Sequence, residues 1–435
     1  MYSLIIHLYA FFIELISPFH KKARLMRLGQ WKTNGILREK IDRNAKYIWF
    51  HASSLGEFEQ GRPLIEKIKA EHPEYKILLT FFSPSGYEVR KNYGGADVVC
   101  YLPFDTPYRV KKFLDLSKPV MAIFIKYEFW DNYLSELKRR NIPVYIVSAI
   151  FRKEQLFFKW YGGMYRKVLS YFTHIFVQDD ASRELLSKYG VTNVSVFGDT
   201  RFDRVQDVYK NTKQVPMVEL FVNNNRSDNQ LTMVAGSSWQ QDEEVYLNYF
   251  NEHPELKLII APHEIHKDHL MHIESMLKRP SIRLSEATEK DIKGKSCLIV
   301  DSFGLLSSIY RYGDLAYIGG GFGAGIHNVL EAAVYGIPVI FGPKYQKFKE
   351  ARDLLQVGGA FSITDEKTFE SKMEELSTYR DLLEAAGAAA GDFVKSNIGA
   401  TNRIIASIPL GGQIYRISNH SKEKRKVTVQ LSCNL

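Results

Sequence analysis

Charged side chains that follow short apolar runs are the residues of this sequence best placed to do chemistry. Glu57, Glu128 and Arg201 each come a few residues after such a run. A carboxylate there could take a proton from a hydroxyl, and a guanidinium could stabilise developing negative charge. Glu57 has a second interpretation that the sequence leaves open, because a carboxylate in the first turn of a helix also complements the helix dipole.

A glycine-rich stretch at residues 314–343 has the pattern of an anion-binding site. A short apolar run precedes five glycines between Gly319 and Gly325, and a helix is predicted to open near Asn328. Glycines let a ligand approach the backbone, and the first amides of a helix point at negative charge. Asn328 can cap this helix while Glu331 reaches a ribose diol, or the two can form only a capping pair. The glycine spacing matches neither a dinucleotide fingerprint nor a GxxxxGK[ST] phosphate loop.

Short apolar runs separated by helical patterns must position these side chains. Such runs are typical of strands buried on both faces of a parallel sheet, where ligands lie beyond the carboxyl ends of the strands. The sequence therefore predicts an α/β protein with two doubly wound, Rossmann-like domains facing across a cleft. The expected strands are residues 47–51, 76–82, 98–102, 120–125, 144–147, 175–177 and 194–197, then 231–235, 256–261, 297–300, 315–318, 339–341 and 360–363.

The first twenty residues are mostly apolar and precede a basic run that starts at His20. A cleaved signal peptide would carry its charge before the apolar part, so we expect an uncleaved membrane-anchoring helix at residues 1–20. His7 and Glu14 would be costly inside a bilayer, which favours an interfacial or oblique anchor over a span. A helix packed on the protein itself is the alternative. Domains are then expected at residues 21–210 and 211–410, with a basic tail at 411–435.

Composition narrows the class of protein. The chain has 435 residues, 45% hydrophobic and 25% charged, which describes a folded globular protein. Three dispersed cysteines suit a reducing compartment, and the net charge of +9 favours an acidic partner, although no nucleic-acid motif accompanies it.

His263, His266 and His269 lack zinc-site spacing, so we expect His263 in a pocket beside Pro262 and the other two at the surface. No Asp-x-Asp pair occurs, which argues against a metal-dependent, single-domain sugar transferase.

Three motifs in the first half resemble those of the Kdo transferases of Gram-negative bacteria. WFHASSLGE, from Trp49, resembles the family's W-I-H-A-x-S-x-G-E, KYEFWDN resembles E-T-E-L-W-P-N, and GDTRFD resembles G-N-x-K-F-D. These enzymes are GT-B glycosyltransferases that move 3-deoxy-D-manno-octulosonic acid (Kdo) from CMP-Kdo onto the lipid A precursor. The resemblance implies that Glu57 is the catalytic base, that Glu128 stabilises the transition state, and that Arg201 takes the role of the family's lysine.

The second half carries the donor motifs of the same family. APHE resembles V-P-R-H, the segment from Phe303 occupies the M-G-E position, and HNVLEAAVYGIPVIFGP is similar to the family's H-N-P-L-E segment. The resemblance implies that CMP is bound by Pro262, His263, Phe303, Gly304, Leu305, Asn328, Val329, Leu330 and Glu331. The sequence departs from the family at Lys126, Arg201, His263 and Leu305, and it lacks the arginine before the H-N pair.

The expected function follows from this resemblance. It is metal-independent, inverting transfer of Kdo from CMP-Kdo to the glucosamine of a lipid A precursor (lipid IVA), without a cofactor. The expected partners are the donor, the acceptor and the membrane surface, with no nucleic acid, and the expected place is the cytoplasmic face of the inner membrane. Two alternatives remain: another GT-B sugar-nucleotide enzyme, such as a UDP-sugar transferase or 2-epimerase, and a non-catalytic, membrane-bound nucleotide-binding protein.

Overall fold

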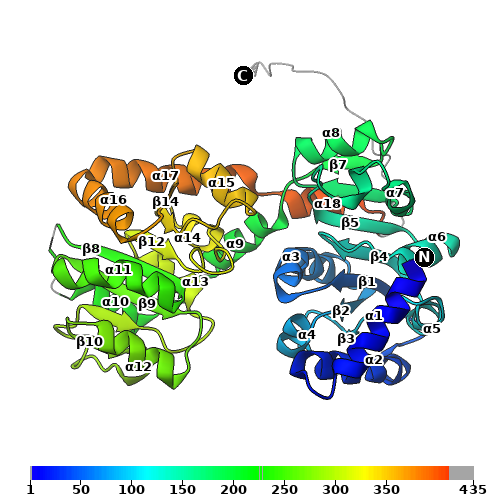
Figure 1. Ribbon diagram of the computed structural model, residues 1–435, viewed down its shortest axis with the longest axis horizontal. Helices are drawn as coiled ribbons and strands as arrows, with labels where there is room; N and C mark the ends of the chain where they lie inside the picture. Colours follow the sequence, from blue (N-terminus) through cyan, green and yellow to red (C-terminus); the bar gives the residue numbers. More distant parts are fainter. Residues whose placement is uncertain (1, 225, 228, 411–435) are drawn as a thin grey trace, which may run out of the picture.

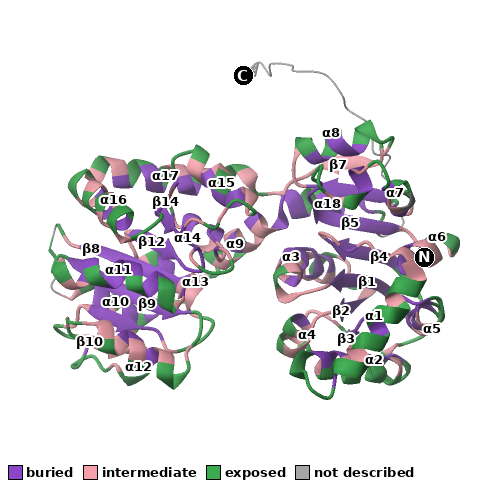
Figure 2. Cartoon of the chain, in the orientation of Figure 1, coloured by how far each residue is buried: buried purple, intermediate pink, exposed green. Residues whose placement is uncertain are grey.

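The computed structural model describes residues 2–224, 226–227 and 229–410, so the predicted basic tail lies outside the described residues. Two α/β domains lie side by side, each built on a seven-stranded sheet whose paired strands are parallel (Figure 1). Helices cover both faces of each sheet, and the strands are the most deeply buried parts of the chain (Figure 2). The predicted class, two doubly wound Rossmann-like domains, is confirmed.

The first sheet has the strand order β3-β2-β1-β4-β5-β6-β7. Its strands are β1 (Lys46–Ala52), β2 (Tyr75–Phe81), β3 (Val98–Tyr101), β4 (Pro119–Ile125), β5 (Val144–Ala149), β6 (His174–Val177) and β7 (Val194–Val196). Its helices are α3 (Leu55–Glu71), α4 (Pro84–Arg90), α5 (Pro107–Ser117), α6 (Asp131–Arg139), α7 (Gly163–Leu169) and α8 (Asp180–Lys188). The order reverses between β1 and β4, and such a switch point opens a crevice at the carboxyl ends of the two strands.

The second sheet has the order β10-β11-β9-β8-β12-β13-β14, with its switch point between β8 and β12. Its strands are β8 (Leu231–Ser238), β9 (Leu256–Pro262), β10 (Ser281–Arg283), β11 (Cys297–Ile299), β12 (Leu315–Ile318), β13 (Val339–Phe341) and β14 (Ala360–Ser362). Its helices are α10 (Pro216–Asn223), α11 (Gln240–Glu252), α12 (Lys267–Met276), α13 (Leu306–Ile309), α14 (Leu330–Ala333), α15 (Lys349–Gln356), α16 (Glu366–Thr378) and α17 (Arg380–Asn397). Every predicted strand is present, and β10 is an additional one.

Two helices contribute side chains to the core of a domain other than the one in which the sequence predicted them. Phe202 of α9 (Thr200–Lys210) packs in the core of the second domain, whereas Ile404 and Ile405 of α18 (Ala400–Ser407) pack in the core of the first. Figure 1 shows α9 between the two sheets and the chain returning from α17 to α18 across the molecule. The predicted range 211–410 is therefore wrong at its end, because burial of isoleucine side chains draws residues 400–410 back onto the first sheet.

The N-terminal segment forms α1 (Tyr2–Ile16) and α2 (Lys21–Lys40), which meet at a bend of 116°. Neither helix alone has the length and apolar composition of a membrane span, although the bent pair passes that test together. α1 touches the first domain through a narrow face that includes Ala10, packed with Met26 and Phe104. Much of the rest of α1 is exposed (Figure 2), and the exposed residues are mostly apolar. Its large exposed side chains are Leu4, Ile5, Leu8, Tyr9, Phe11, Phe12, Leu15 and Ile16.

Candidate active site

Glu57 lies at the carboxyl end of β1, in the first turn of α3. Its Oε2 accepts hydrogen bonds from the backbone amides of Ser53 (2.6 Å) and Ser54 (3.2 Å), which completes a capping box. Its Oε1 has no hydrogen-bond partner among the described residues. Burial, and next the charge of Glu128, raise the pKa of Glu57 to about 7, although the two amides and Lys126 oppose the rise. Glu57 therefore caps its helix with one oxygen and leaves the other for proton transfer near neutral pH.

Glu128 follows β4 on the other side of the switch point and is buried. Its Oε2 accepts from Trp130 Nε1 (2.5 Å) and lies 3.0 Å from Nε2 of the fully buried His51. His51 Nδ1 lies 2.9 Å from the Thr80 hydroxyl, which in turn accepts from Trp49 Nε1 at 2.8 Å. His51 Nδ1 also lies 3.2 Å from the Thr80 carbonyl oxygen, so hydrogen-bond acceptors face both ring nitrogens. These contacts hold His51 beside Glu128, and His51 was not among the predicted site residues.

Lys126 interacts electrostatically both with Glu57 and with charged residues of the domain interface. It has a left-handed backbone (φ 66°), a conformation that is uncommon for residues other than glycine. Burial, and next the charge of Arg201, lower the pKa of Lys126, while Asp199, Glu350 and Glu57 act to raise it. Its charge is therefore within electrostatic reach of both Glu57 and the interface.

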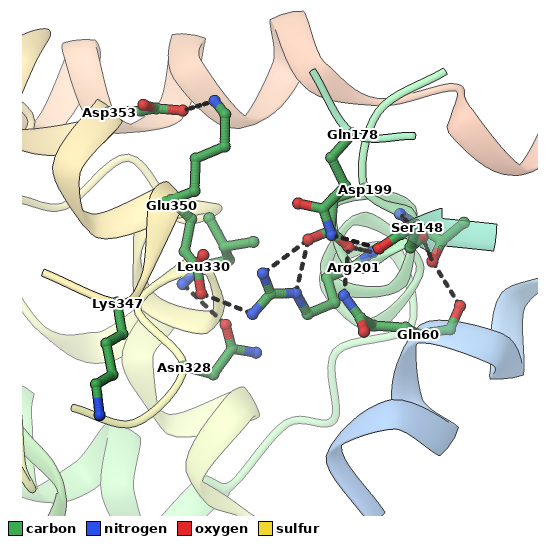
Figure 3. A network of polar contacts seen from close by, with 12 residues as sticks. Gln60, Ser148, Gln178, Asp199, Arg201, Asn328, Leu330, Lys347, Glu350 and Asp353 are labelled. Atoms are coloured by element: carbon green, nitrogen blue, oxygen red, sulfur yellow. Dashed lines mark hydrogen bonds and ion pairs between the residues drawn. The ribbon is translucent and has the colours of Figure 1, made fainter. Parts of the chain in front are cut away.

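Arg201 joins the two domains (Figure 3). In the first domain its Nε and Nη2 donate to Asp199 Oδ2 at 2.9 and 2.7 Å, and across the cleft its Nη1 donates to Glu350 Oε1 at 2.6 Å. Burial acts to lower the pKa of Arg201, but the two carboxylates outweigh it and raise that pKa. Glu350 is buried at the start of α15 and was not predicted. The guanidinium is thus compensated by two carboxylates rather than open to a ligand.

The switch point of the second sheet carries a stack of three rings. Trp239 stacks on His263, and His263 stacks on His327, each pair with centroids 4.5 Å apart. Trp239 Nε1 also donates to His327 Nε2 (3.2 Å), while burial and next His263 lower the pKa of His327 to about 4. A cavity of about 690 Å³ opens here between the start of α11 and the glycine loop. Its lining residues include Trp239, Gln240, Gln241, Glu244, Gly320, Ala324 and His327.

A buried carboxylate holds the glycine loop against the sheet. Asp242 Oδ2 accepts from the backbone amides of Gly320 (2.8 Å) and Trp239 (2.9 Å). Gly319 and Gly321 pack directly on backbone atoms, where a β-carbon would not fit. The predicted close approach therefore exists, but the glycines serve packing between backbones as well as access to the cavity. Trp239 and Asp242 were missed because β8 extends to Ser238, three residues beyond the predicted strand 231–235, so that both residues follow the loop that was expected to line the pocket.

Asn328 and Glu331 bind each other. Asn328 Nδ2 donates to Glu331 Oε1 (3.0 Å) and its Oδ1 accepts from the Leu330 amide (3.2 Å), so the two side chains pair with each other, although the N-cap residue of α14 is Val329 and no capping box forms. The helix begins at Leu330, two residues later than predicted. Burial raises the pKa of Glu331, while Asn328 opposes the rise. Val329 and Leu330 are fully buried, which leaves their backbone rather than their side chains to face a ligand.

The remaining predicted residues lie around the same edge of the second sheet. Pro262 ends β9, Phe303 is 75% exposed, Gly304 has a positive φ of 84°, and Leu305 packs against the core. His269 is not a free surface residue, because its Nε2 lies 2.9 Å from the buried Glu243 carboxylate. Within the described residues, no group of three or more His, Cys, Asp and Glu side chains could hold a metal ion.

The chain is similar to proteins of one family. A family model described as 3-deoxy-D-manno-octulosonic-acid transferase (kdotransferase) matches residues 24–204. The 3-deoxy-D-manno-octulosonic acid transferase of Aquifex aeolicus is 30% identical over 337 residues, which are 76% of this chain and 85% of that protein. The enzyme of the same name from Haemophilus influenzae is 25% identical over 372 residues, 82% of this chain and 85% of that protein.

Solved structures with the same fold include UDP-GlcNAc 2-epimerase from Neisseria meningitidis bound to UDP-GlcNAc. It is 14% identical, with a TM-score of 0.59 that covers 83% of this chain and 99% of that one. MurG from Acinetobacter baumannii is 10% identical, with a TM-score of 0.52 over 83% of this chain and 98% of the other. At this identity the likeness supports the two-domain GT-B fold and nothing finer.

Proposed function

The chain belongs to the 3-deoxy-D-manno-octulosonic acid (Kdo) transferase family of lipopolysaccharide synthesis, and we propose that it moves Kdo from CMP-Kdo to a glucosamine hydroxyl of a lipid A precursor such as lipid IVA. The transfer is a direct displacement with inversion that needs no metal, at the cytoplasmic face of the inner membrane. The observation that carries this proposal is the pair Glu57 and Glu128 at the first switch point, where Lys126 interacts electrostatically with Glu57 and with the Arg201–Glu350 pair of the domain interface.

Glu57 serves as the general base. Its Oε1 takes the proton of the acceptor hydroxyl as that oxygen forms a bond to the anomeric carbon of Kdo, and the bond to the CMP phosphate breaks with its electron pair on the phosphate oxygen. A pKa near 7 suits this task, because a base works best when its pKa lies close to the working pH. Glu128, fixed by His51 and Trp130, supplies the negative charge that suits a positively charged sugar in the transition state.

The lipid acceptor is favoured by the position of α1. Tyr9 of α1 stacks on Phe82 with centroids 6.5 Å apart, and Phe82 lies 4.7 Å from the ring of Trp130, which donates to Glu128. The exposed apolar face of α1 therefore belongs to the same end of the domain as the two carboxylates. A helix with such a face next to a basic run is suited to the membrane interface, where the acyl chains of the acceptor would remain.

The donor is assigned to the second switch point. The cavity beside Trp239 and the glycine loop offers ring faces and the first turn of α11, and Asn328 and Glu331 offer polar groups next to α14. Ring faces suit a nucleobase and amides suit a phosphate. Arg201 can contribute to phosphate binding only if a ligand replaces Glu350 at its Nη1, because both carboxylates now compensate its charge.

The variant Glu57→Gln tests the assignment of the base. The new amide keeps an oxygen for the Ser53 and Ser54 amides but cannot accept a proton, so CMP binding should persist while Kdo transfer falls by about 10²–10⁴-fold. Glu71→Gln, at the exposed end of the same helix, is the matched control. Full transfer by Glu57→Gln would refute the base. Calorimetry that shows UDP binding in place of CMP would favour the UDP-sugar alternative.

A further inference from the structure

A second cavity, of about 230 Å³, lies in the first domain away from both switch points. It is formed by α2, by the loop that follows β3 and by the first two turns of α5. The lining residues are Gln30, Trp31, Asn34, Pro103, Tyr108, Arg109 and Lys112. Two of them are cations, none is acidic, and two are aromatic. We call this cavity the α2–α5 pocket.

The cations of the α2–α5 pocket lack carboxylate partners. Neither Arg109 nor Lys112 forms an ion pair in the part of the chain that the structure describes; instead Arg109 lies 5.4 Å from the centre of the Phe104 ring. Asp115, one turn along α5 from Lys112, is paired with Arg140 at 2.8 Å. Uncompensated cations at a concave surface attract an anion.

A buried amide adds a directional donor to this charge. Gln30 is only 4% exposed, and its Oε1 accepts from the Phe104 backbone amide at 3.1 Å, which fixes the orientation of the side chain. Its Nε2 is buried without a hydrogen-bond partner. A buried donor without an acceptor costs free energy that a ligand oxygen would recover. Gln30, which carries this unpaired N–H group, is therefore part of the pocket wall beside the two cations.

The pocket adjoins the apolar helix α1. The Phe104 ring, which Arg109 contacts, also meets the ring of Tyr9 of α1 edge-on at 5.7 Å. Trp31 and Tyr108 line the pocket yet are 59% and 74% exposed. Tryptophan and tyrosine gather at membrane interfaces, at the depth of the lipid head groups. The cations are thus placed where a phosphate would lie if α1 rests in the membrane surface.

We propose that the α2–α5 pocket binds the phosphate of a membrane lipid head group, with Arg109 and Lys112 as counter-charges and Gln30 Nε2 as hydrogen-bond donor. This inference rests on the proposed attachment of α1 to the membrane and does not depend on the chemistry at Glu57. Two lipids could supply the phosphate: a bulk anionic phospholipid, or the phosphorylated glycolipid acceptor itself. The pocket would then fix the rotation of the first domain about α1, in addition to strengthening its attachment.

The test compares two double variants of the full chain. Arg109→Gln with Lys112→Gln removes the two pocket cations, and Lys111→Gln with Lys138→Gln removes two exposed lysines from α5 and α6. Flotation is measured with phosphatidylcholine vesicles that contain or lack phosphatidic acid, at about 0.15 M salt, where exposed charges are well screened. Each basic residue near an anionic surface contributes roughly fivefold to the affinity for vesicles. The pocket variant should therefore lose about 25-fold in affinity for the acidic vesicles, and the control variant should lose much less.

A second measurement separates the two lipid sources. If the acceptor's own phosphate occupies the pocket, the vesicle affinities stay equal, but the pocket variant raises KM for detergent-dispersed acceptor about tenfold with kcat unchanged. Gln30→Glu keeps an oxygen for the Phe104 amide but removes the N–H donor. It should lower the affinity for acidic vesicles or raise KM for the acceptor, in the same assay in which the pocket variant has its effect. Equal behaviour of the two double variants in both assays would overturn the proposal. Absence of Kdo transfer by the unmodified chain would refute the proposed function, while the vesicle result would still decide the pocket.

Discussion

Replacing Glu128 by glutamine should change the pH dependence of transfer in a defined direction. The pKa of Glu57 is raised to about 7 first by burial and second by the charge of Glu128. The variant removes the second cause and leaves the first, along with the Ser53 and Ser54 amides that lower this pKa. The glutamine side chain would keep an oxygen for His51 and Trp130, so the local structure should persist. The pKa of Glu57 should therefore fall from about 7.

The magnitude follows from the usual effect of a nearby charge on a carboxyl pKa, which is about one unit or more. We therefore expect the acidic midpoint of kcat/KM to move down from near pH 7 by about one pH unit, equivalent to about 1.4 kcal/mol. A general base must be ionised, so kcat/KM falls below this midpoint and is constant above it. The rate at the plateau should also fall, since Glu128 is proposed to stabilise the transition state.

The assay is the initial rate of transfer against pH at low donor concentration, with Glu71→Gln as the control for charge removal. A midpoint that stays near pH 7 or rises in Glu128→Gln, with normal thermal unfolding, would show that the two carboxylates do not share one site. A midpoint that moves equally in Glu71→Gln would assign the shift to the overall charge of the domain.

Three further predictions concern the cleft, the donor cavity and α1. Glu350→Ala leaves Arg201 with Asp199 alone, so it should lower the free energy of unfolding by about 1–3 kcal/mol in urea titrations, whereas Glu374→Ala on the exposed side of α16 should change it little. Trp239→Ala removes the ring that covers His263, so CMP affinity measured by calorimetry should fall about tenfold, and Trp239→Phe, which keeps a ring, should lose less. Phe11→Glu with Leu15→Glu places charge on the exposed face of α1, so the protein should leave the membrane fraction without a lower melting temperature, and unchanged sedimentation would contradict the anchor.

The sheets were predictable because their strands are buried on both faces, which produces unbroken apolar runs. β10 was missed for the opposite reason: Ser281–Arg283 is a short, half-buried strand at the sheet edge, with a polar residue at each end. The domain core in which α9 and α18 pack could not be predicted either. The amphipathic pattern of a helix shows that it has an apolar face but not which core that face contacts.

The carboxylates of the site were predictable from one rule, that the residues after parallel strands gather at one edge of the sheet. The residues that contact these charged side chains were not predicted. Glu350 lies 149 residues from Arg201, in the first turn of an ordinary helix, so nothing local marks it as a partner. His51 did leave a signal: it lies two residues from Trp49 on β1, so both side chains point to the same face, and both contact Thr80 of the next strand.

The contacts of α1 argue that this helix is part of the catalytic domain rather than a tether. Tyr2 donates to Asp105 Oδ2 (2.6 Å), and Ser3 donates to Asn132 Oδ1 (3.2 Å). Asp105 is itself fixed by the backbone amides of Asn132 and Tyr133 at the start of α6. A flexible tether would let the domain turn freely above the bilayer, whereas these bonds give the carboxylate edge one orientation relative to the apolar face of α1. The proposed acceptor, with its acyl chains in the bilayer, would need that fixed orientation, because its hydroxyl would have to meet a base that cannot approach by diffusion.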